Sequence, residues 1–315
     1  MKNSKVLVIG GGGYIGSSLV QFLRSNGFNV EICDSIGSNH SFNFKFNFDF
    51  KFLTKKDIEQ FSHIILLAGH SSVKSCEGPF LSSYKNNVNN FVEIVDKLSS
   101  NISMVYASSS SVYGDSKQNV VTENMLEFKP NNYYDLTKYL IDMINLGTTN
   151  HNIVGLRFGT VNGVSPLLRT DVMINAMVNS AKIDNHIKLY VKEVHRPILG
   201  TNDLNRAVKT ILSNEHKGEK FFNLASFNDT AGSIATKVSE ICNVPIVEIE
   251  MPINSKVQTI NAKLQTAAYD FSIDTSLFQN VYNFSFHETV SSITKELIEN
   301  WDKMEKVSRS KFINY

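Results

Sequence analysis

The amino-acid sequence predicts an α/β protein built on a doubly wound parallel sheet, and two patterns support this prediction. Near the N-terminus, the apolar residues 6–9 have the character of a short buried strand, and a glycine-rich turn then leads into helical periodicity at 17–23. Farther along the first half of the chain, strand-like runs continue to alternate with helix-like stretches. This alternation is typical of a parallel sheet with helices on both faces.

The remaining elements are expected in the following order along the chain. Strands are expected at residues 30–33, at the end of 41–52, and at 64–67, 104–107 and 153–158, with helices at 84–98 and 133–146. Beyond residue 163 the pattern weakens to helices at 171–182, 204–212, 232–241 and 287–306 and a strand at 187–191. We therefore expect a sheet-based domain over 1–163, to which parts of 198–225 return, and a smaller region over 164–315.

Residues 41–52 alternate strictly between phenylalanine and other side chains. In an extended chain, this alternation places all six phenylalanines on one face. We therefore expect the segment to end in the third strand of the sheet, with the rings covered by a layer of helices.

The turn after the first strand carries Gly10, Gly13 and Gly16, with Tyr14 and Ile15 between the last two. Glycine at such positions allows a tight turn and a close approach of backbone to a pyrophosphate. The following helix N-terminus attracts phosphate through its N–H groups and its partial positive charge. Glycine-rich turns also occur without a ligand, but the order strand, turn, helix is the context that a dinucleotide site requires.

Asp34 ends the second expected strand, 18 residues after Gly16. A carboxylate at this place accepts hydrogen bonds from ribose hydroxyls and repels a 2′-phosphate. Residues 25–44 contain no Lys or Arg that would neutralise such a phosphate. The sequence therefore predicts NAD rather than NADP as the cofactor; the alternative is that Asp34 only caps a turn.

Composition narrows the remaining classes of function. The chain has 315 residues, of which 42% are hydrophobic and 19% charged, with a net charge of +1, so a nucleic-acid partner is not expected. Cys33, Cys76 and Cys242 are far apart and predict neither a disulfide framework nor a metal site. Because the N-terminus leads straight into a strand and no apolar run reaches about 18 residues, we expect a cytoplasmic protein without a membrane span.

Tyr134 and Lys138 form a Tyr-x-x-x-Lys pair on an expected helix, where positions i and i+4 share a face. A tyrosine is a weak base near neutrality, but a neighbouring cation favours its phenolate. Such a pair is common by chance; Ser109, which lies 25 residues earlier at the end of an expected strand, makes it more specific. Ser109 can hold a substrate hydroxyl while Tyr134 removes its proton.

With these motifs, the chain resembles the extended short-chain dehydrogenase/reductases that act on sugar nucleotides, which have a Rossmann-type sheet and a smaller C-terminal substrate-binding region. The resemblance implies that Ser109, Tyr134 and Lys138 are catalytic. It further implies cofactor contacts at Gly10, Gly13, Tyr14, Ile15, Gly16, Asp34, Asp49, Phe50, Leu67, Ala68, Gly69, Asn86, Tyr134 and Lys138. Implied substrate contacts are Ser109, Ser110, Thr160, Asn162, Arg169 and Arg196.

The residues after Ser109 limit the reaction that the resemblance implies. The 4,6-dehydratases of this family carry an Asp-Glu pair there, whereas this chain has Ser110 and Ser111, so dehydration is not expected. Oxidation of the C4 hydroxyl of a nucleotide-diphosphate sugar remains, with a 4-epimerase or a 4-dehydrogenase as the outcome. Departures from the family pattern, among them Ile9, Thr160 and Asn162 in place of the usual tyrosine, make a role in surface-polysaccharide synthesis, including oxidation of a GDP-heptose, at least as attractive as an ordinary UDP-hexose 4-epimerase, which stays the alternative.

Three further expectations complete the sequence analysis. The family resemblance implies a homodimer formed through the helices near residues 84–98 and 133–147. Arg157 lies in a buried strand, so we expect it to pair with a structural carboxylate rather than with a ligand. A non-catalytic NAD-sensing regulator on the same fold is a second alternative, which the presence of Ser109, Tyr134 and Lys138 disfavours.

Overall fold

The structure is a computed structural model. It describes residues 5–35, 43–114, 116, 120–125, 128, 130–148, 152–215, 218–249 and 270–307. Among these residues, no helix combines the length and the apolar character needed to cross a lipid bilayer.

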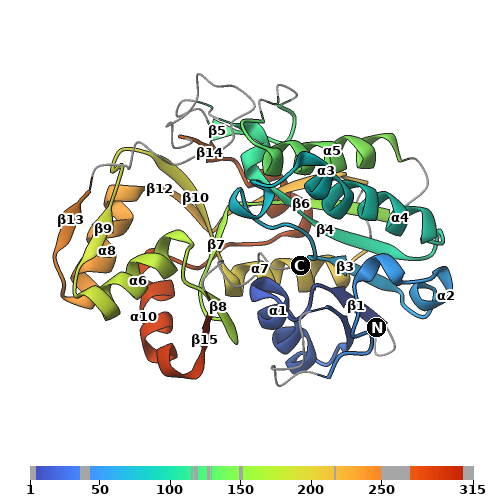
Figure 1. The fold of residues 1–315 in the computed structure, drawn as a ribbon, viewed down its shortest axis with the longest axis horizontal. Coiled ribbons are helices and arrows are strands. Elements are labelled where there is room, and N and C mark those ends of the chain that lie inside the picture. Colours follow the sequence, from blue (N-terminus) through green and yellow to red (C-terminus); the bar gives the residue numbers. More distant parts are fainter. Residues whose placement is uncertain are drawn as a thin grey trace.

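A six-stranded parallel sheet forms the centre of the molecule (Figure 1). Its strand order is β11-β6-β4-β3-β1-β2. The strands are β1 (Lys5–Ile9), β2 (Asn29–Cys33), β3 (His63–Leu66), β4 (Ser103–Ser109), β6 (Asn152–Phe158) and β11 (Phe221–Leu224). Because β2 and β3 lie on opposite sides of β1, the order reverses there, and such a point is where open α/β sheets bind ligands.

Helices cover both faces of this sheet, as the sequence predicts. Side chains of β1 alternate between the two faces: Val6 and Val8 pack with α1 (Tyr14–Ser25) and α7 (Thr201–Leu212). Leu7 and Ile9 pack on the other face, against apolar residues of α4 (Asn90–Lys97) and α5 (Tyr133–Gly147). Because apolar side chains cover both faces of β1, all four of its residues 6–9 are apolar.

The prediction of a strand at the end of residues 41–52 is wrong for the described part of that segment, 43–52. An isolated bridge between Cys33 and Phe46 is all the strand pairing that these residues form. The Asp49 carboxylate then accepts a hydrogen bond from the Lys51 N–H, which starts a 3-10 turn, Phe50–Phe52. The phenylalanine side chains at alternate positions from Phe44 to Phe50 are buried or partly buried. Phe52 is 64% exposed, because the turn breaks the alternation.

The other helices of the first half lie close to their predicted positions. After α2 (Lys55–Ile58), the helix expected at 84–98 begins earlier, with α3 (Phe80–Tyr84), and continues through a π-helical turn, Lys85–Asn89, into α4. The helix expected at 133–146 is α5.

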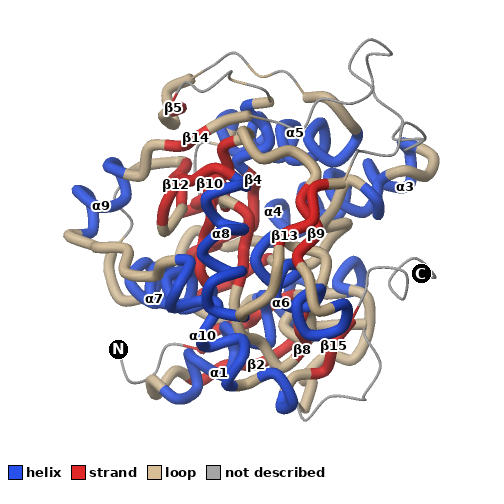
Figure 2. Tube along the Cα trace, turned by 90° about the vertical axis from the view of Figure 1, so that its left-hand side faces the viewer, coloured by secondary structure: helices blue, strands red, loops and turns tan. Residues whose placement is uncertain are grey.

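The second half contains α6 (Met173–Asp184), α8 (Ala231–Cys242), α9 (Ser276–Tyr282) and α10 (Val290–Glu299). Figure 2 shows α6 and α8 beside the pair formed by β9 (Ile187–Leu189) and β13 (Ile246–Glu248), and α10 packs against α6 and α8. The helix expected at 287–306 is shorter, since it ends at Glu299 and is followed by a 3-10 turn, Trp301–Lys303, and by β15 (Glu305–Val307).

Short strands join the two halves. A three-stranded sheet consists of β7 (Thr160–Asn162), β10 (His195–Gly200) and β12 (Phe227–Thr230). Two-stranded pairs are β5 (Val120–Val121) with β14 (Ser272–Ile273), and β8 (Leu167–Arg169) with β15. The division of the chain at residue 163 stays a prediction.

Candidate active site

The glycine-rich turn lies at the carboxyl end of β1, where the strand order reverses. Gly10 has a φ of +87°, and a Cβ placed on it would lie 2.5 Å from the backbone nitrogen of Ala68. A Cβ on Gly16 would lie 2.1 Å from the Gly10 carbonyl oxygen. Around Gly13, the nearest described atom would be 3.5 Å away, an ordinary contact. Packing therefore requires Gly10 and Gly16, whereas the absence of a side chain at Gly13 leaves space for a ligand.

The start of α1 suits an anion. Within the described residues, no side chain caps this end of the helix, and its first turn holds no acidic residue. Asp34 follows β2 and is mostly buried, and its Oδ2 accepts a hydrogen bond from the N–H of Gly12 at 2.8 Å. A carboxylate held beside an uncapped helix N-terminus fits the ribose and the pyrophosphate of a dinucleotide.

Two residues of the turn are packed into the protein. Tyr14 is buried; its hydroxyl donates to the Gly163 carbonyl at 3.0 Å and accepts from the Asn175 side-chain amide at 3.0 Å. Burial raises the pKa of Tyr14 well above its usual value. Ile15 packs against the larger hydrophobic core. Tyr14 thus fastens the turn to the segment that leads into α6.

Other predicted cofactor residues surround the turn. Leu67 and Ala68 both donate their backbone N–H to the Ile9 carbonyl, at 2.8 and 3.0 Å, so the chain after β3 lies beside the end of β1. Gly69 has a φ of +137°. Asp49 forms an ion pair with Lys51, and Phe50 is buried in the core under α4. Contacts of all these residues with the adenine or the rest of the cofactor stay predictions.

The π-helical turn Lys85–Asn89 brings two neighbouring asparagines to one backbone group. The N–H of His70 donates to the Oδ1 of Asn86 at 2.9 Å and to the Oδ1 of Asn87 at 2.7 Å. Asn87 also donates to the His70 carbonyl and to Thr137 on α5. Sequence reasoning selected Asn86 and missed Asn87, which is the more buried of the two. Asn86 was selected from the family resemblance; an Asn-Asn pair inside a helix is a signal that could have marked both residues, since asparagine is a poor helix former.

The three predicted catalytic residues come together where β4 meets α5. Asn132 caps α5 by accepting from the Asp135 N–H at 2.9 Å, which places Tyr134 in the first turn. One turn later, Lys138 lies with its Nζ 5.9 Å from the centre of the Tyr134 ring. The same Nζ donates to the carbonyl oxygen of Ala107, on β4, at 2.7 Å.

Burial shapes the ionisation of this group. It raises the pKa of Tyr134 to about 12; a hydrogen bond with Ser109 and the charge of Arg169 oppose that rise. Burial also lowers the pKa of Lys138 to about 8, although the Asp142 carboxylate acts in the other direction. Arg169, on β8, forms an ion pair with Asp171 at 2.9 Å, and its positive charge favours the Tyr134 phenolate.

The remaining predicted substrate residues have varied surroundings. Ser110 is buried, and its hydroxyl donates to the Phe158 carbonyl at 2.8 Å. Asn162 is fully buried, and its Oδ1 accepts from the backbone N–H of Ile174 at the start of α6. Thr160 and Arg196 are partly exposed, on β7 and β10. The Ser110 and Asn162 side chains thus contribute to packing, and their contact with a substrate stays a prediction.

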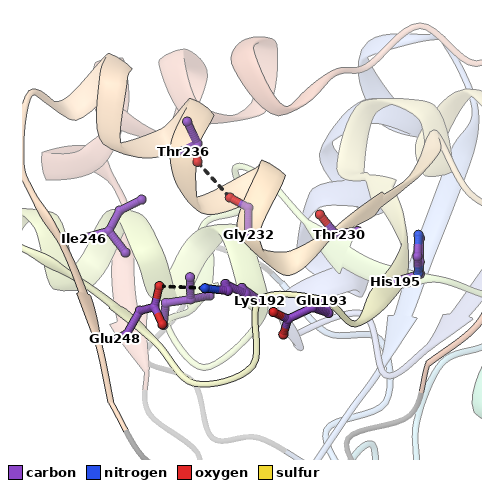
Figure 3. A pocket seen from close by; sticks show the side chains of 9 residues that line it. Lys192, Glu193, His195, Thr230, Gly232, Thr236, Ile246 and Glu248 are labelled. Atoms are coloured by element: carbon purple, nitrogen blue, oxygen red, sulfur yellow. Dashed lines mark hydrogen bonds and ion pairs between the residues drawn. The ribbon is translucent and has the colours of Figure 1, made fainter.

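A pocket of about 690 Å³ lies in the second half of the molecule (Figure 3). Its walls come from β9, β13, the start of α8 and the segment before β10, and Lys192 pairs with Glu248 across it at 3.4 Å. None of the predicted site residues lines it. In the described part of the chain, no group of three or more His, Cys, Asp or Glu side chains is arranged to hold a metal ion.

Sequence comparison identifies the family of the chain. The profile of the NAD dependent epimerase/dehydratase family matches residues 6–225. A UDP-glucose 4-epimerase of Lactobacillus helveticus is 30% identical in an alignment over 151 residues that covers 44% of this chain and 46% of that protein. UDP-glucose 4-epimerase 2 of Oryza sativa subsp. japonica is 32% identical in an alignment over 161 residues that covers 44% of this chain and 39% of the relative. The match thus spans less than half of these curated relatives.

Solved structures share the fold over nearly the whole chain. MoeE5 in complex with UDP-glucuronic acid and NAD superposes with a TM-score of 0.80 at 21% identity, covering 95% of this chain and 99% of that one. The UDP-N-acetylglucosamine 4-epimerase of Methanobrevibacter ruminantium superposes with a TM-score of 0.80 at 18% identity, covering 95% and 100%. The strand–turn–helix site at Gly10–Gly16, the acid at Asp34 and the family match agree: the chain belongs to the NAD-dependent epimerase/dehydratase family, and its cofactor is NAD.

Proposed function

We propose that this chain is an NAD-dependent oxidoreductase that oxidises the C4 hydroxyl of a nucleotide-diphosphate sugar, as a 4-epimerase or a 4-dehydrogenase. The observation that carries the proposal is the assembly of Ser109, Tyr134 and Lys138 at the junction of β4 and α5, beside the switch point of the sheet. The sequence matches to UDP-glucose 4-epimerases support this reaction class.

Each of these side chains has a role that its surroundings allow. Ser109 holds the substrate hydroxyl, and the Tyr134 phenolate takes its proton. Lys138 and Arg169 supply positive charge near Tyr134, which favours the ionised base. NAD held at the glycine-rich turn, with Asp34 at its ribose, would supply the acceptor for the hydride of the sugar C4.

Net dehydration is disfavoured because the two residues after Ser109 carry hydroxyls. Ser110 donates to the Phe158 carbonyl, and the Ser111 hydroxyl lies 2.8 Å from that of Ser109. Neither side chain offers the carboxylate that elimination of water from a neighbouring carbon would use as an acid or base. Turnover at a single carbon is the chemistry that remains.

The finer assignment stays within the same proposal. A UDP-hexose 4-epimerase has the support of the curated relatives. An enzyme of surface-polysaccharide synthesis, acting for example on a GDP-heptose, has the support of Asn162, which stands where the family usually has a tyrosine. The Asn162 side chain is buried, and its Oδ1 accepts a hydrogen bond from the Ile174 N–H at the start of α6. The identity of the nucleotide and of the sugar decides between them.

Anaerobic incubation of the purified protein with NAD⁺ and a panel of UDP-, GDP- and dTDP-sugars tests the proposal. NADH absorbance and product mass are followed together. NADH accumulation with a product two hydrogens lighter identifies a 4-dehydrogenase, and an isomer of unchanged mass without net NADH identifies an epimerase. Tight NAD binding with neither signal for any sugar contradicts the proposal and favours the NAD-sensing regulator.

We also propose that the protein is a cytoplasmic homodimer, formed through the helical stretch 80–97 and α5. Apolar side chains on these helices support the dimer, since Leu81 is 59% exposed and Leu146 is 45% exposed. Analytical ultracentrifugation at micromolar concentration tests it, and a monomer under these conditions contradicts it.

A further inference from the structure

The phenylalanines of residues 43–52 do not all face the same hydrophobic core. Phe46, Phe48 and Phe50 pack with the core under α4, on one face of the central sheet. Phe44 instead packs against the core on the opposite face, which contains residues of α1. One ring of the series therefore lies on the side of the sheet where α1 follows the glycine-rich turn.

Backbone hydrogen bonds hold Phe44 and the residues after it beside the end of β2. The N–H groups of Lys45 and Phe46 both donate to the Ile32 carbonyl at 3.1 Å. In return, the N–H of Asp34 donates to the Phe46 carbonyl at 3.1 Å. The main chain thus fixes the position of Phe44 relative to Asp34, the residue that fits the ribose of the cofactor.

Gly12 shows how near the Phe44 ring comes to the Asp34 carboxylate. A Cβ placed on Gly12 would lie 3.1 Å from the Oδ2 of Asp34, and 3.2 and 3.3 Å from the Cζ and Cε1 of Phe44. The N–H of Gly12 donates to the same Oδ2 at 2.8 Å. The carboxylate and the ring edge therefore border one space beside the glycine-rich turn. The edge of an aromatic ring carries partial positive charge, which suits a neighbouring carboxylate.

We propose that Phe44 is a specificity-determining residue for the cofactor. Its ring forms one wall of the ribose site next to Asp34, contacts the adenosine half of NAD and occupies the space that the 2′-phosphate of NADP needs. Asp34 acts on the same choice through charge, because a carboxylate accepts hydrogen bonds from ribose hydroxyls and repels a phosphate. Phe44 acts through shape. The inference concerns the cofactor alone and does not depend on the reaction or the sugar.

Charge and shape can be separated by substitution, because they belong to different side chains. Asp34→Asn removes the negative charge at nearly the same size and leaves the ring in place. Phe44→Ala removes the ring and leaves the carboxylate. Since residues 25–44 contain no Lys or Arg, neither substitution uncovers a nearby cation in this segment that would attract the 2′-phosphate.

Calorimetric titration with NAD and with NADP tests the inference in the wild type, both single variants and the double variant. We expect Asp34→Asn to keep at least a tenfold preference for NAD, roughly the effect of one lost favourable contact on Kd. Adding Phe44→Ala should remove most of that preference. The Kd for NAD should rise about tenfold when the ring contact is lost, whereas the Kd for NADP should change less than about threefold.

Phe48→Ala is the matched control, since it deletes the same ring from the same segment on the face away from α1. Its ratio of Kd values for NADP and NAD should stay within about twofold of the wild type, and urea unfolding shows whether each variant is folded. If Phe44→Ala does not fold, Phe44→Leu, which keeps an apolar side chain without the ring, takes its place.

Three outcomes overturn the inference. The first is an Asp34→Asn protein that binds NAD and NADP equally well, because charge alone would then make the choice. The second is a ratio that does not change when Phe44→Ala is added, which would make Phe44 a packing residue. The third is an equal change in ratio for Phe48→Ala, which would indicate a general disturbance of the segment. Failure of every nucleotide sugar to react would contradict the proposed function and leave these binding results intact.

Discussion

The Nζ atom of Lys138 donates a hydrogen bond to the carbonyl oxygen of Ala107 at 2.7 Å, and this bond ties α5 to β4. Because Ser109 ends β4 and Tyr134 lies in the first turn of α5, the bond fixes the distance between the strand and the helix that carry them. Lys138 thus supports the geometry of the site in addition to supplying charge.

Removal of the Tyr134 hydroxyl should separate catalysis from cofactor binding. Tyr134→Phe keeps the aromatic ring and deletes the group that takes the proton. We expect turnover to fall by about 10²–10⁴-fold, the usual contribution of a general base, with the Kd for NAD within about threefold of the wild type. Calorimetric titration with NAD and the nucleotide-sugar assay measure the two quantities. Unchanged turnover in the Tyr134→Phe variant would contradict the assignment of Tyr134 as the base.

Two glycines of the turn should respond differently to alanine. Gly16→Ala places a Cβ 2.1 Å from the Gly10 carbonyl oxygen, so we expect it to destabilise the protein by about 2 kcal/mol or more. Gly13→Ala makes only an ordinary contact at 3.5 Å, so its stability should stay within about 1 kcal/mol of the wild type. NAD affinity should nevertheless fall at least about tenfold, because the methyl group occupies the space left for the pyrophosphate.

Urea unfolding without NAD and a binding titration with NAD measure these effects. The two variants act as controls for each other, since one perturbs the fold and the other the ligand. A Gly13→Ala protein that binds NAD like the wild type would refute the placement of the pyrophosphate at this turn.

The pairing of Arg157 with a structural carboxylate is confirmed: its Nε lies 2.8 Å from the Oδ2 of Asp142, and both side chains are fully buried. Asp142 also accepts from the Tyr106 hydroxyl, at 2.8 Å. Arg157→Met alone leaves a buried carboxylate without its cation, and we expect a loss of about 3–5 kcal/mol in the free energy of unfolding.

A second substitution should relieve that loss. Arg157→Met with Asp142→Leu removes both charges, so most of the stability should return. Urea unfolding of the single and double variants gives the comparison. A double variant that is as unstable as Arg157→Met would show that the damage comes from lost packing.

Glu288 should make stability depend on pH. Its carboxylate accepts a hydrogen bond from the Asp203 N–H at 2.7 Å. Burial raises the pKa of Glu288 to about 7, and the negative charges of Asp203 and Glu296 act in the same direction. Since this pKa lies above the unfolded value, the folded state binds more protons between about pH 4.5 and 7. The contribution of Glu288 to the free energy of unfolding is therefore fully present below about pH 4.5 and is lost as the pH rises through about 7.

Glu288→Gln keeps an oxygen acceptor and removes the titration. Relative to this variant, the wild type should lose about 1–3 kcal/mol between pH 5 and pH 8. Chemical denaturation of both proteins at the two pH values measures the difference. Parallel pH dependences would show that Glu288 does not titrate in this range.

The parts of the fold that sequence predicts well are those with long periodic patterns. α5 and the strands of the central sheet other than β11 follow from apolar runs and helical spacing, because each buries a complete face. β7, β8 and β14 have three or fewer residues, too short for any periodicity, and pair through long-range contacts that the local sequence does not encode. At residues 43–52, the alternation of phenylalanine with other residues predicts a strand, but Asp49 caps a 3-10 turn there instead.

The candidate site divides in a similar way. Ser109, Tyr134, Lys138 and the glycine turn were predictable because fixed spacing on regular elements brings them together. The hydrogen bonds of Ser111 and Asn87 were not, since they depend on how a 3-10 turn and a π-helical turn aim neighbouring side chains. The burial of Asn162, whose Oδ1 accepts from the Ile174 N–H at the start of α6, was not predicted either, and its contact with a substrate stays a prediction.

The position of β11 at the edge of the central sheet has a consequence for synthesis of the chain. β6 is complete at Phe158, but its outer neighbour is supplied only by Phe221–Leu224. A ribosome adding roughly 5–20 residues per second needs several seconds to make the intervening segment. During that interval the nascent sheet ends in an open, apolar strand edge of the kind that invites aggregation. Residues 159–220 thus set the time for which a chaperone would have to shield this edge.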